Sequence, residues 1–416
     1  MRILLLTNVL PYPLDSGAKV RAYYMLRYLA ARHEVTLVSF GRDSDRADAL
    51  EHLKSLCKGV SVVAMKRTRL ADARAFIRSV LNGQPFTVLR DARHEMDAAL
   101  TDLVSRQPYD AIHADQLSMA QYALLARAVM RARWPQAQPL LLLDAHNAYY
   151  LIPRRMAEVA RNPAVKMMLL REARLLEKYE ADIYQRFQHV LTVTDEDLRA
   201  IRQLRQFAGD APHFTMLPIC IDGDLPRKAR RSDARGLLFI GGLHWPPNAD
   251  AVRWFASEIW PVVHAEVPAA RVYIVGARAP DDIRALGDFP GIRQPEQSGD
   301  APIVVTGYVD NPEPFISASA ALIVALRSGG GMRVKIIEAL QWGLPIVTTT
   351  VGGEGINLTA RQDAMVADDA RQFARAVIEV LNNPALSGRL SDNGRQLVQS
   401  RYDWHKVYSA LDGIYH

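Results

Sequence analysis

The stretch Leu326–Gly355, LRSGGGMRVKIIEALQWGLPIVTTTVGGEG, decides how this chain folds. It continues an apolar run, Ala320–Leu326, that is bounded by polar residues and predicts a buried strand. Three glycines separate this strand from Met332–Trp342, whose apolar residues recur at helical spacing. A second apolar run, Leu344–Thr350, predicts another strand and leads into the glycine-rich turn Gly352–Gly355. Strand, glycine loop, helix and strand in this order indicate an α/β protein with a parallel sheet.

The start of the predicted helix combines features that suit an anion. The first helical N–H groups have no partner inside the helix and carry about half a positive charge between them. Glycines allow the backbone to approach a phosphate closely. Arg333 and Lys335 add full charges where the helix dipole alone favours acids, so we interpret the loop as a phosphate or diphosphate site. Glu338, one turn further on, can accept hydrogen bonds from sugar or ribose hydroxyls. The alternative is a flexible glycine turn followed by charged side chains that contact only solvent.

The same residues carry a resemblance to a known family. The run GGGMRVKIIEAL, followed two residues later by GLPIV, resembles the donor-site signature of retaining GT-B glycosyltransferases of family 4, in a GGGMR-type branch. The second of the two glutamates in that signature matches Glu338, which implies a contact with the ribose of the nucleotide. The first glutamate contacts the transferred sugar, and here its position is Gly330. The resemblance places Gly330, Gly331 and Met332 among the donor-binding residues, where a backbone amide can replace the missing carboxylate.

Length and composition describe an ordinary globular chain. Its 416 residues predict about two to three domains, and its hydrophobic content of 49% and charged content of 23% are usual. Two cysteines, Cys57 and Cys220, are too few for a disulfide framework and favour a reducing cytoplasm. The apolar start Met1–Leu6 is too short for a signal peptide and predicts a first strand. No apolar run reaches the roughly eighteen residues that a transmembrane helix needs.

The formal net charge is +6, and basic residues are concentrated in Lys66–Arg93 and Arg154–Arg186. Such segments form a solvated face, bind an anionic membrane surface or bind nucleic acid. A solvated face is the commonest explanation. The resemblance favours the membrane, because many of these enzymes glycosylate lipid-linked acceptors. No zinc spacing, helix-turn-helix pattern or aromatic RNA-binding signature supports nucleic acid.

The first residues of the chain open a doubly wound sheet. Arg2–Leu6 predicts a strand, Ala18–Arg32 a helix and His33–Phe40 a second strand, and the loop before the helix ends in Gly17. A full dinucleotide-binding fingerprint is absent, which disfavours an NAD-dependent oxidoreductase. In the resembled family a glycine at the position of Gly17 lies near the donor phosphate and the acceptor.

Two histidines follow predicted strands and are expected at the edge of the sheet where ligands bind. His113 ends the run Tyr109–His113, and His146 comes just after Leu140–Asp144. A single histidine in such a place is more often structural than functional. The resemblance distinguishes the two, because the family has a histidine at the position of His146 that contacts the donor sugar near the reacting carbon.

Two Asp-x-Asp pairs raise the question of a metal ion. Asp43 and Asp45 precede one predicted helix, and Asp195 and Asp197 precede another. Carboxylates at helix starts are commonly caps, so we favour capping at both pairs and predict no metal.

The second half of the chain repeats the alternation of strands and helices. The resemblance assigns a first phosphate loop to the turn at Gly242 and base contacts to Tyr308 and Val309. Family members often carry Arg and Lys near the first loop, whereas this chain has His244 and Asn248. Arg333 and Lys335 are therefore expected to supply more of the charge that offsets the diphosphate.

We thus expect a GT-B fold, with two Rossmann-like, doubly wound parallel-sheet domains facing a cleft. The predicted parts are an acceptor-side domain (1–215), a nucleotide-sugar domain (216–400) and a terminal helix returning to the first domain (401–416). Polar and proline-bearing sequence near 211–231 predicts the linker.

The expected function is retaining sugar transfer from a nucleotide-sugar to a glycan or lipid-linked acceptor in cell-surface polysaccharide synthesis. His146, Arg333 and Lys335 are the expected catalytic residues, with no cofactor and no nucleic-acid partner. The expected location is the cytoplasm, including the inner face of the plasma membrane. A nucleotide-sugar 2-epimerase of the same fold and a non-catalytic nucleotide-sugar-binding subunit are the alternatives.

Overall fold

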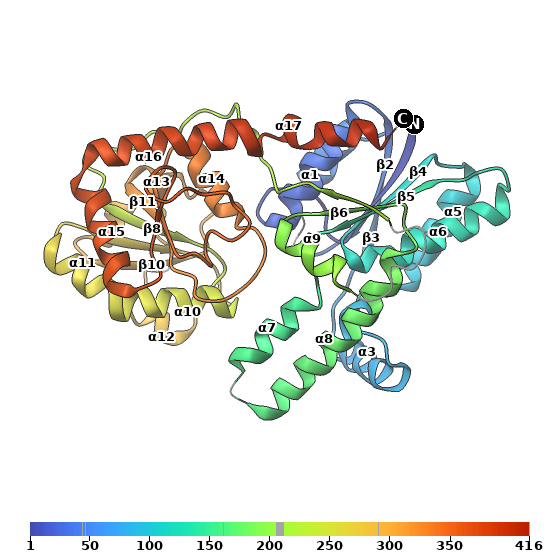
Figure 1. The fold of residues 1–416 in the computed structure, drawn as a ribbon, viewed down its shortest axis with the longest axis horizontal. Coiled ribbons are helices and arrows are strands. Elements are labelled where there is room, and N and C mark those ends of the chain that lie inside the picture. Colours follow the sequence, from blue (N-terminus) through green and yellow to red (C-terminus); the bar gives the residue numbers. More distant parts are fainter. Residues whose placement is uncertain (44, 46, 161, 205–211, 290, 416) are drawn as a thin grey trace. The chain divides into compact units, whose positions relative to one another are not determined.

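The structure is a computed structural model that describes residues 1–416 except 44, 46, 161, 205–211, 290 and 416 (Figure 1). The chain divides into two compact units. Unit 1 comprises Met1–Cys220 and Trp404–His416, and unit 2 comprises Ile221–Asp403. The observed boundaries lie a few residues after the expected ones at 215 and 400, and part of the expected linker lies outside the described residues.

The described part of unit 1 contains a seven-stranded parallel sheet in the order β3-β2-β1-β4-β5-β6-β7. Its strands are β1 (Arg2–Thr7), β2 (Glu34–Gly41), β3 (Gly59–Ala64), β4 (Ala111–Asp115), β5 (Leu140–Ala145), β6 (His189–Thr192) and β7 (His213–Met216). Its helices are α1 (Gly17–Ala30), α2 (Ala47–Leu56), α3 (Arg69–Asn82), α4 (Phe86–Arg90), α5 (His94–Arg106), α6 (Ala120–Arg133), α7 (Leu151–Val159), α8 (Pro163–Tyr184), α9 (Asp195–Arg202) and α17 (Trp404–Tyr408).

The described part of unit 2 contains a six-stranded parallel sheet in the order β10-β9-β8-β11-β12-β13. Its strands are β8 (Gly236–Ile240), β9 (Arg271–Val275), β10 (Ile303–Gly307), β11 (Ser319–Val324), β12 (Ile346–Thr348) and β13 (Met365–Val366). Its helices are α10 (Pro246–Trp254), α11 (Trp260–Glu266), α12 (Asp281–Arg284), α13 (Glu313–Ser317), α14 (Val334–Trp342), α15 (Ala370–Asn382) and α16 (Pro384–Leu397).

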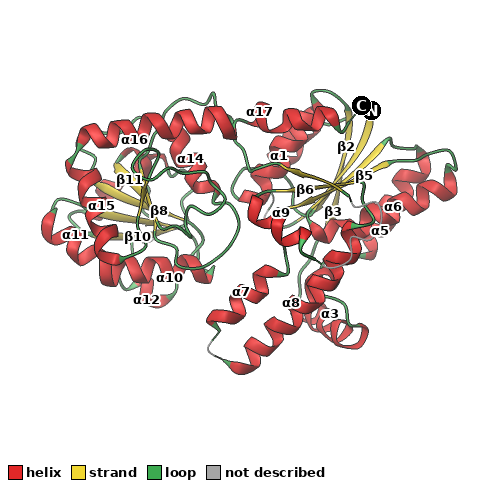
Figure 2. Ribbon diagram, in the orientation of Figure 1, coloured by secondary structure: helices red, strands yellow, loops and turns green. Residues whose placement is uncertain are grey.

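Near-continuous apolar runs explain why these strands are central. Every residue of β11 is buried, as are all but the first residues of β1 and β5. Parallel strands buried on both faces read as unbroken apolar segments, because helices cover both sides of the sheet. Figure 2 shows helices on both sides of each sheet. The expected α/β architecture with two parallel sheets is therefore confirmed. No helix within the described residues is both long and apolar enough to cross a bilayer.

The helix of the central stretch begins later than expected. It was expected at Met332, but α14 begins at Val334, and Arg333 precedes it with extended backbone angles. Gly329 and Gly331 have φ values of 119° and 79°, which keep this part of the chain out of the helical region and favour glycine. Gly343 ends the helix as expected, with a left-handed φ of 78°.

Two helices were not expected, and a third helical segment is interrupted. The sequence analysis did not predict α7 or α16. Helix α10 begins at Pro246 and continues through a π-helical turn, Phe255–Ile259, into α11. Proline at the first helical positions of α10 and α16 suits a helix start, since its missing N–H needs no partner there.

The C-terminal segment packs on α1 within unit 1. The hydroxyl of Tyr408 donates to the backbone oxygen of Arg21 at 3.1 Å, and the ring of Trp404 packs edge-on against Tyr28. Tyr415 is buried, and its hydroxyl lies 2.6 Å from Nδ1 of His113. The last residues of the chain therefore complete the core of the unit formed by its first 220.

A fully buried ion pair lies beneath this segment. Arg21 donates to both carboxylate oxygens of Asp144, from Nε at 2.7 Å and Nη2 at 2.8 Å, and from Nη1 to the backbone oxygen of Leu217 at 2.6 Å. Burial raises the pKa of Asp144, but the charges of Arg21 and the nearby histidines, together with the hydrogen bonds from Arg21, outweigh burial and hold the pKa below its usual value. A bidentate pair of this kind connects α1, β5 and the segment after β7.

We expect Arg21→Ala to lower the free energy of unfolding by about 3–5 kcal/mol, because it leaves the Asp144 carboxylate buried and unpaired. Urea denaturation measures the change. The double variant Arg21→Met/Asp144→Leu removes both charges and should recover most of the loss. Wild-type stability in Arg21→Ala would contradict this role for the pair.

Candidate functional site

The glycine-rich stretch of unit 2 lies at the point where the strand order reverses. From β8 the chain proceeds to β9 and β10 on one side, and β11 returns to the other side of β8. Ligands of doubly wound sheets bind at the carboxyl ends of strands beside such a reversal. The loops after β8 and β11 are therefore the expected ligand loops. The loop after β8 contains Gly241 and Gly242, and the loop after β11 contains Gly329–Gly331.

Lys335, in the first turn of α14, connects these two loops. Its Nζ donates to the backbone oxygen of Ile240 at 3.0 Å and to Oδ1 of Asn248 at 3.3 Å, and lies 4.7 Å from the centre of the Phe239 ring. These partners are neutral, and within the described residues no carboxylate forms an ion pair with Lys335. Burial, with the nearby Arg333 charge, lowers its pKa to about 7. The ammonium group is therefore held without an anion that would stabilise its charge.

Arg333 is folded back against the glycine loop. Its Nη1 donates to the backbone oxygen of Gly330, and to that of Gly331 at 2.7 Å. A Cβ added at Gly329 would lie 2.8 Å from Nη2 of Arg333, so the Arg333 side chain would have to shift, and it is the φ of 119° that favours glycine here. Arg333 thus shapes the loop besides adding charge beside Lys335.

Glu338 lies one turn further along α14 than Lys335. Its side chain is half-buried, and burial raises its pKa to about 7. A carboxylate in such an environment gains from hydroxyl donors, because they replace the water that burial removes. This setting suits the predicted contact with ribose hydroxyls.

Most of the other residues predicted to bind the donor also lie in unit 2, whereas Gly17 lies in unit 1. Asn248 donates from Nδ2 to the backbone oxygen of Gly242 at 3.0 Å, so it holds the first loop while accepting from Lys335. His244 is exposed within that loop, and Met332 is buried beneath the second one. Tyr308 and Val309 follow edge strand β10, and Tyr308 is 70% exposed, so its side chain is open to solvent. Gly17 begins α1 in unit 1.

The site of unit 1 also lies beside a strand-order reversal, between β1 and β4. His146 follows β5, and its Nε2 lies 2.7 Å from Oδ1 of Asp115 at the end of β4 and 3.8 Å from Oδ2 of Asp144. Burial lowers the pKa of His146, but the two carboxylates outweigh burial and raise it above its usual value. The arrangement therefore favours a charged imidazolium ring beside the carboxyl ends of the strands.

Asp115, Asp144 and His146 present ligand atoms within 4.8 Å of one another, close enough to hold a metal ion. Both oxygens of Asp144 already accept from Arg21, so one of the three candidate ligands is committed to a cation. This donor set suits an imidazolium held by Asp115 better than a metal. The sequence analysis missed Asp115, Asp144 and Arg21, although an Asp at the end of an apolar strand was a visible signal for two of them.

His113 and the Asp-x-Asp pairs have structural environments. His113 is fully buried beside Tyr415, and burial lowers its pKa to about 4. Thr194 caps α9 by accepting from the backbone N–H of Asp197 at 3.0 Å, and Asp197 accepts from the backbone N–H of Ala148 at 2.9 Å. Asp45 accepts from the backbone N–H of Arg42 at 2.8 Å. The cap of α9 is therefore Thr194, and the Asp197 carboxylate instead accepts from Ala148 and from the Thr194 hydroxyl.

Unit 1 gathers arginines at the carboxyl ends of β2 and β3. Nη2 of Arg67 lies 2.9 Å from Oδ1 of Asp91, and Nε of Arg90 lies 3.6 Å from the same oxygen. Burial, followed by the charges of Arg67 and Arg90, lowers the pKa of Arg42, although Asp45 and Asp91 partly offset this. This arginine cluster, Arg42, Arg67 and Arg90, is more positive than its two carboxylates can balance. It suits an anionic group at the ligand edge of unit 1.

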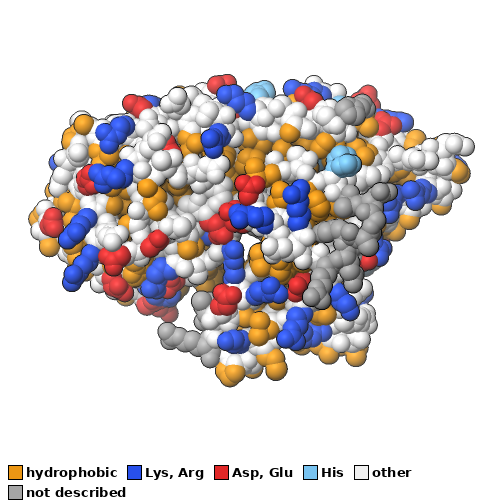
Figure 3. Space-filling model, viewed as in Figure 1, with side chains coloured by type: hydrophobic (Ala, Val, Ile, Leu, Met, Phe, Trp, Pro, Cys, Tyr) orange, Lys and Arg blue, Asp and Glu red, His pale blue; other side chains and the backbone are white. Residues whose placement is uncertain are grey.

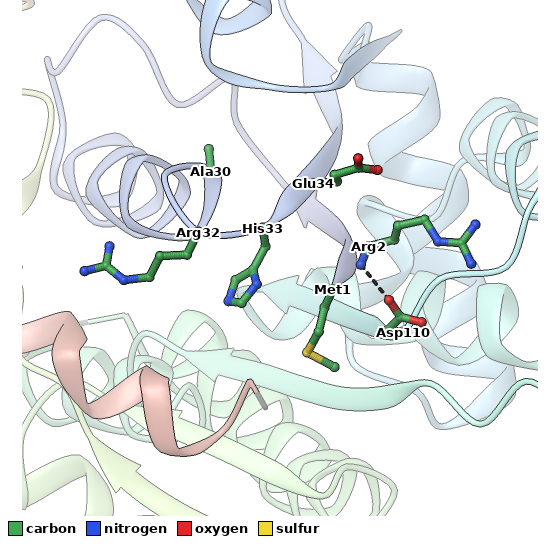
Figure 4. A pocket seen from close by; sticks show the side chains of 7 residues that line it. All are labelled: Met1, Arg2, Ala30, Arg32, His33, Glu34 and Asp110. Atoms are coloured by element: carbon green, nitrogen blue, oxygen red, sulfur yellow. Dashed lines mark hydrogen bonds between the residues drawn. The ribbon is translucent and has the colours of Figure 1, made fainter.

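Two surface hollows lie at the opposite edges of the sheets. The hollow in Figure 4, about 510 Å³, is lined by residues at the amino ends of β1 and β2, and the backbone N–H of Arg2 donates to Asp110 there at 2.6 Å. A second, about 500 Å³, lies at the amino ends of β8 and β9, near Gly236 and Arg271. Ligands of parallel sheets bind at the carboxyl ends, so neither hollow is part of the candidate site.

Comparison with known sequences identifies the class of protein. Residues 16–220 match the family described as glycosyl transferase 4-like domain, and residues 234–383 match the family described as glycosyl transferases group 1. Together with the two parallel-sheet units, these matches show that the chain belongs to the glycosyltransferases of the GT-B fold.

Individual relatives are distant. A protein described as an uncharacterized 44.6 kDa protein in the cps region of Klebsiella pneumoniae is 22% identical over 415 residues, covering 99% of this chain and 98% of its own. Glycogen synthase of Mycobacterium tuberculosis is 33% identical over 81 residues, 19% of this chain and 20% of its own.

Solved structures share the fold across the chain. Sucrose-phosphate synthase from Thermosynechococcus elongatus aligns with a TM-score of 0.66 at 17% identity, covering 100% of this chain and 98% of its own. HepE from Anabaena, solved with UDP and glucose, aligns with a TM-score of 0.67 at 12% identity, covering 100% and 99%. WaaG, a glycosyltransferase involved in lipopolysaccharide biosynthesis, aligns with a TM-score of 0.62 at 14% identity, covering 99% of each chain.

The environments of Lys335 and Glu338 predict opposite pH dependences for diphosphate binding. An anion stabilises charged Lys335, so from this residue affinity should fall as pH rises above about 7, by up to tenfold per pH unit. Charged Glu338 accepts hydroxyl donors better, so from this residue affinity should rise as pH rises towards about 7 and level off above it. Titration of UDP by calorimetry from pH 6 to 9 should show the falling profile in Glu338→Gln and lose it in Lys335→Gln. An unchanged profile in Lys335→Gln would contradict the assignment.

Proposed function

We propose that this protein is a retaining glycosyltransferase that moves a sugar from a nucleotide-sugar donor to a glycan or lipid-linked acceptor in cell-surface polysaccharide synthesis. One observation carries the proposal. Lys335 holds an ammonium group between the glycine loops after β8 and β11, with neutral partners only among the described residues. A half-buried cation without an anion at a ligand edge suits a diphosphate.

The donor assignment rests on the chemistry of α14 and its loops. Lys335 and Arg333 provide positive charge near the helix start, Glu338 accepts from ribose hydroxyls, and the exposed ring of Tyr308 offers a surface for a base. HepE, which shares the fold, has been solved with UDP and with UDP-glucose, which supports a uridine nucleotide as the first donor to test.

The catalytic proposal is stabilisation of the departing diphosphate. Charge developing on its oxygens is offset by Lys335 and Arg333, which are already positioned before the reaction begins. These cations provide the charge that a divalent ion supplies in metal-dependent GT-A enzymes, so we propose a metal-independent reaction. His146 is proposed to act on the transferred sugar, because it matches the family histidine that contacts this sugar. Its hydrogen bond to Asp115 orients the ring and favours the charged form.

Retention follows if the acceptor attacks from the face that the diphosphate leaves. In that mechanism the leaving phosphate oxygen takes the proton of the acceptor hydroxyl, the new glycosidic bond forms and the bond to the diphosphate breaks. No enzymatic carboxylate is then required as the base. The family resemblance of Gly330–Glu338 supports this stereochemistry.

The acceptor proposal rests on unit 1. The arginine cluster suits an acceptor that carries phosphate, as lipid-linked glycans do. The relative from the cps region and the structural similarity to WaaG, described as acting in lipopolysaccharide biosynthesis, favour cell-surface glycans as the class to test. A cytoplasmic location at the inner face of the plasma membrane is part of the same proposal.

Substitution of the cations tests the catalytic assignment. We expect Lys335→Ala and Arg333→Ala each to lower turnover by about a hundredfold or more, comparable with the loss of one oxyanion-stabilising donor. Release of nucleotide diphosphate from a panel of nucleotide-sugars with a crude acceptor extract measures this. Lys228→Ala is the matched control, because Lys228 is a half-buried lysine of unit 2 that pairs with Glu313 at 3.2 Å. Near-normal turnover in both site variants would refute the assignment.

The same assay separates the alternatives. Sugar transfer requires an acceptor, whereas a 2-epimerase converts the donor alone and shows no acceptor dependence. A non-catalytic subunit would be stabilised by nucleotide-sugars but would release no diphosphate under any acceptor condition. Proton NMR of the anomeric centre in the product then distinguishes retention from inversion.

A further inference from the structure

Helix α3 presents its apolar side chains to solvent. Its packed face contains the small residues Ala75 and Ser79, both buried. The large apolar residues project from the other face, and Leu81 is 77% exposed. They are Leu70, Phe76, Ile77, Val80 and Leu81. At 100° per residue, Leu70, Ile77 and Leu81 lie opposite Ser79, so the outermost stripe of the helix is apolar. This reverses the usual orientation of a surface helix.

The first turns of α8 add a second set of exposed apolar side chains. They are Val165, Met167, Met168 and Leu170, and Met167 is 71% exposed. Together with lysine and arginine side chains, Met167 and Leu170 line a hollow of about 490 Å³ along this helix.

Arg171 connects the two helices. From α8 it donates Nη2 to the backbone oxygen of Ser79 at 2.8 Å and Nη1 to the Ser79 hydroxyl at 3.1 Å. Ser79 belongs to the packed face of α3, so α8 contacts that face and the apolar stripe of α3 points away from this contact. The exposed side chains that these two adjoining helices carry are called here the α3–α8 surface.

Basic residues accompany the apolar ones on this surface. The exposed members are Arg69, Arg74 and Arg78 on α3 and Lys166, Arg174 and Lys178 on α8. Nearby acids are engaged elsewhere: Glu172 accepts from the backbone N–H groups of Phe86 and Thr87, and Glu177 pairs with Arg154. Figure 3 shows blue basic side chains among orange hydrophobic ones over the end of unit 1 that carries α7 and α8. Asp72 on α3 is half-buried, so basic side chains predominate among the exposed charges of this surface.

We propose that the α3–α8 surface docks unit 1 on an anionic phospholipid membrane. Leucine, isoleucine and methionine side chains enter the boundary between headgroups and acyl chains, while arginine and lysine side chains contact anionic headgroups. A second copy of the chain fits less well, because a two-fold contact would bring the same cations against one another. This inference extends the proposed function by assigning its membrane surface, and lipid binding can be measured without donor or acceptor.

Vesicle co-sedimentation of the full-length protein tests the proposal. Binding is expected to vesicles of phosphatidylcholine with phosphatidylglycerol, and to be at least about tenfold weaker to phosphatidylcholine alone. Ile77→Asp/Leu81→Asp should weaken binding to the anionic vesicles by about tenfold or more, because it removes inserted apolar area and adds like charge. Arg74→Glu/Arg78→Glu should weaken it to a similar extent and remove most of its salt dependence.

The matched control is Val262→Asp/Leu286→Asp, which makes the same kind of change at exposed positions of unit 2. It should bind anionic vesicles like the wild type. Circular dichroism and UDP thermal shift verify that each variant is folded. Equal binding to both vesicle types, unaltered binding by Ile77→Asp/Leu81→Asp, or no binding by the wild type would overturn the proposal. Dimerisation of the wild type that this variant abolishes, seen by analytical ultracentrifugation without vesicles, would also overturn it in favour of self-association.

The readout is separate from the proposed catalytic function. Absence of vesicle binding by the wild type, with intact UDP binding, overturns the membrane assignment alone. Failure of every nucleotide-sugar to react, with vesicle binding intact, overturns the enzymatic proposal alone.

Discussion

The ammonium group of Lys335 is the interaction on which the candidate site of unit 2 depends. It is attached to the helix after β11, yet its partners belong to the end of β8 and the start of α10. One side chain therefore holds together two loops that are about ninety residues apart in sequence, at the reversal of strand order. Asn248 extends this arrangement by binding the first loop through Gly242. Because the ammonium group is half-buried, keeping its charge there costs free energy when no ligand is bound. A bound anion offsets this cost.

The charged groups at the strand-order reversal of unit 1 are paired with one another, unlike Lys335 in unit 2. Two carboxylates, Asp115 and Asp144, meet two cationic groups, His146 and Arg21, and burial strengthens all of these interactions. Arg21 compensates Asp144, which leaves Asp115 to orient His146. The ring is thereby held in one orientation by groups from β4 and β5. A rigid polar group at this edge is suited to act on a ligand that arrives already positioned.

The sequence revealed most of the fold because the strands are unbroken apolar runs and the helices begin or end at recognisable residues. Gly343 ended α14 where expected, but the start of α14 could not be located from periodicity, since the backbone angles of Gly329 and Gly331 decide it. The approximate site was visible at Gly330–Glu338, where charge and glycine coincide in sequence. Asp115, Asp144 and Arg21 form a network only after strands far apart in sequence become neighbours, and no local pattern specifies such pairing.

The C-terminal segment makes unit 1 discontinuous, with unit 2 synthesised between its two parts. On the ribosome, Trp404, Tyr408 and Tyr415 emerge only after every strand of unit 2 has been translated. Until then the nascent first unit lacks the side chains that cover α1 and His113, and the apolar surface that they cover remains exposed to solvent. Unit 2, which is continuous in sequence, can close its core earlier. The order of translation thus makes the first unit to be started the last to be finished.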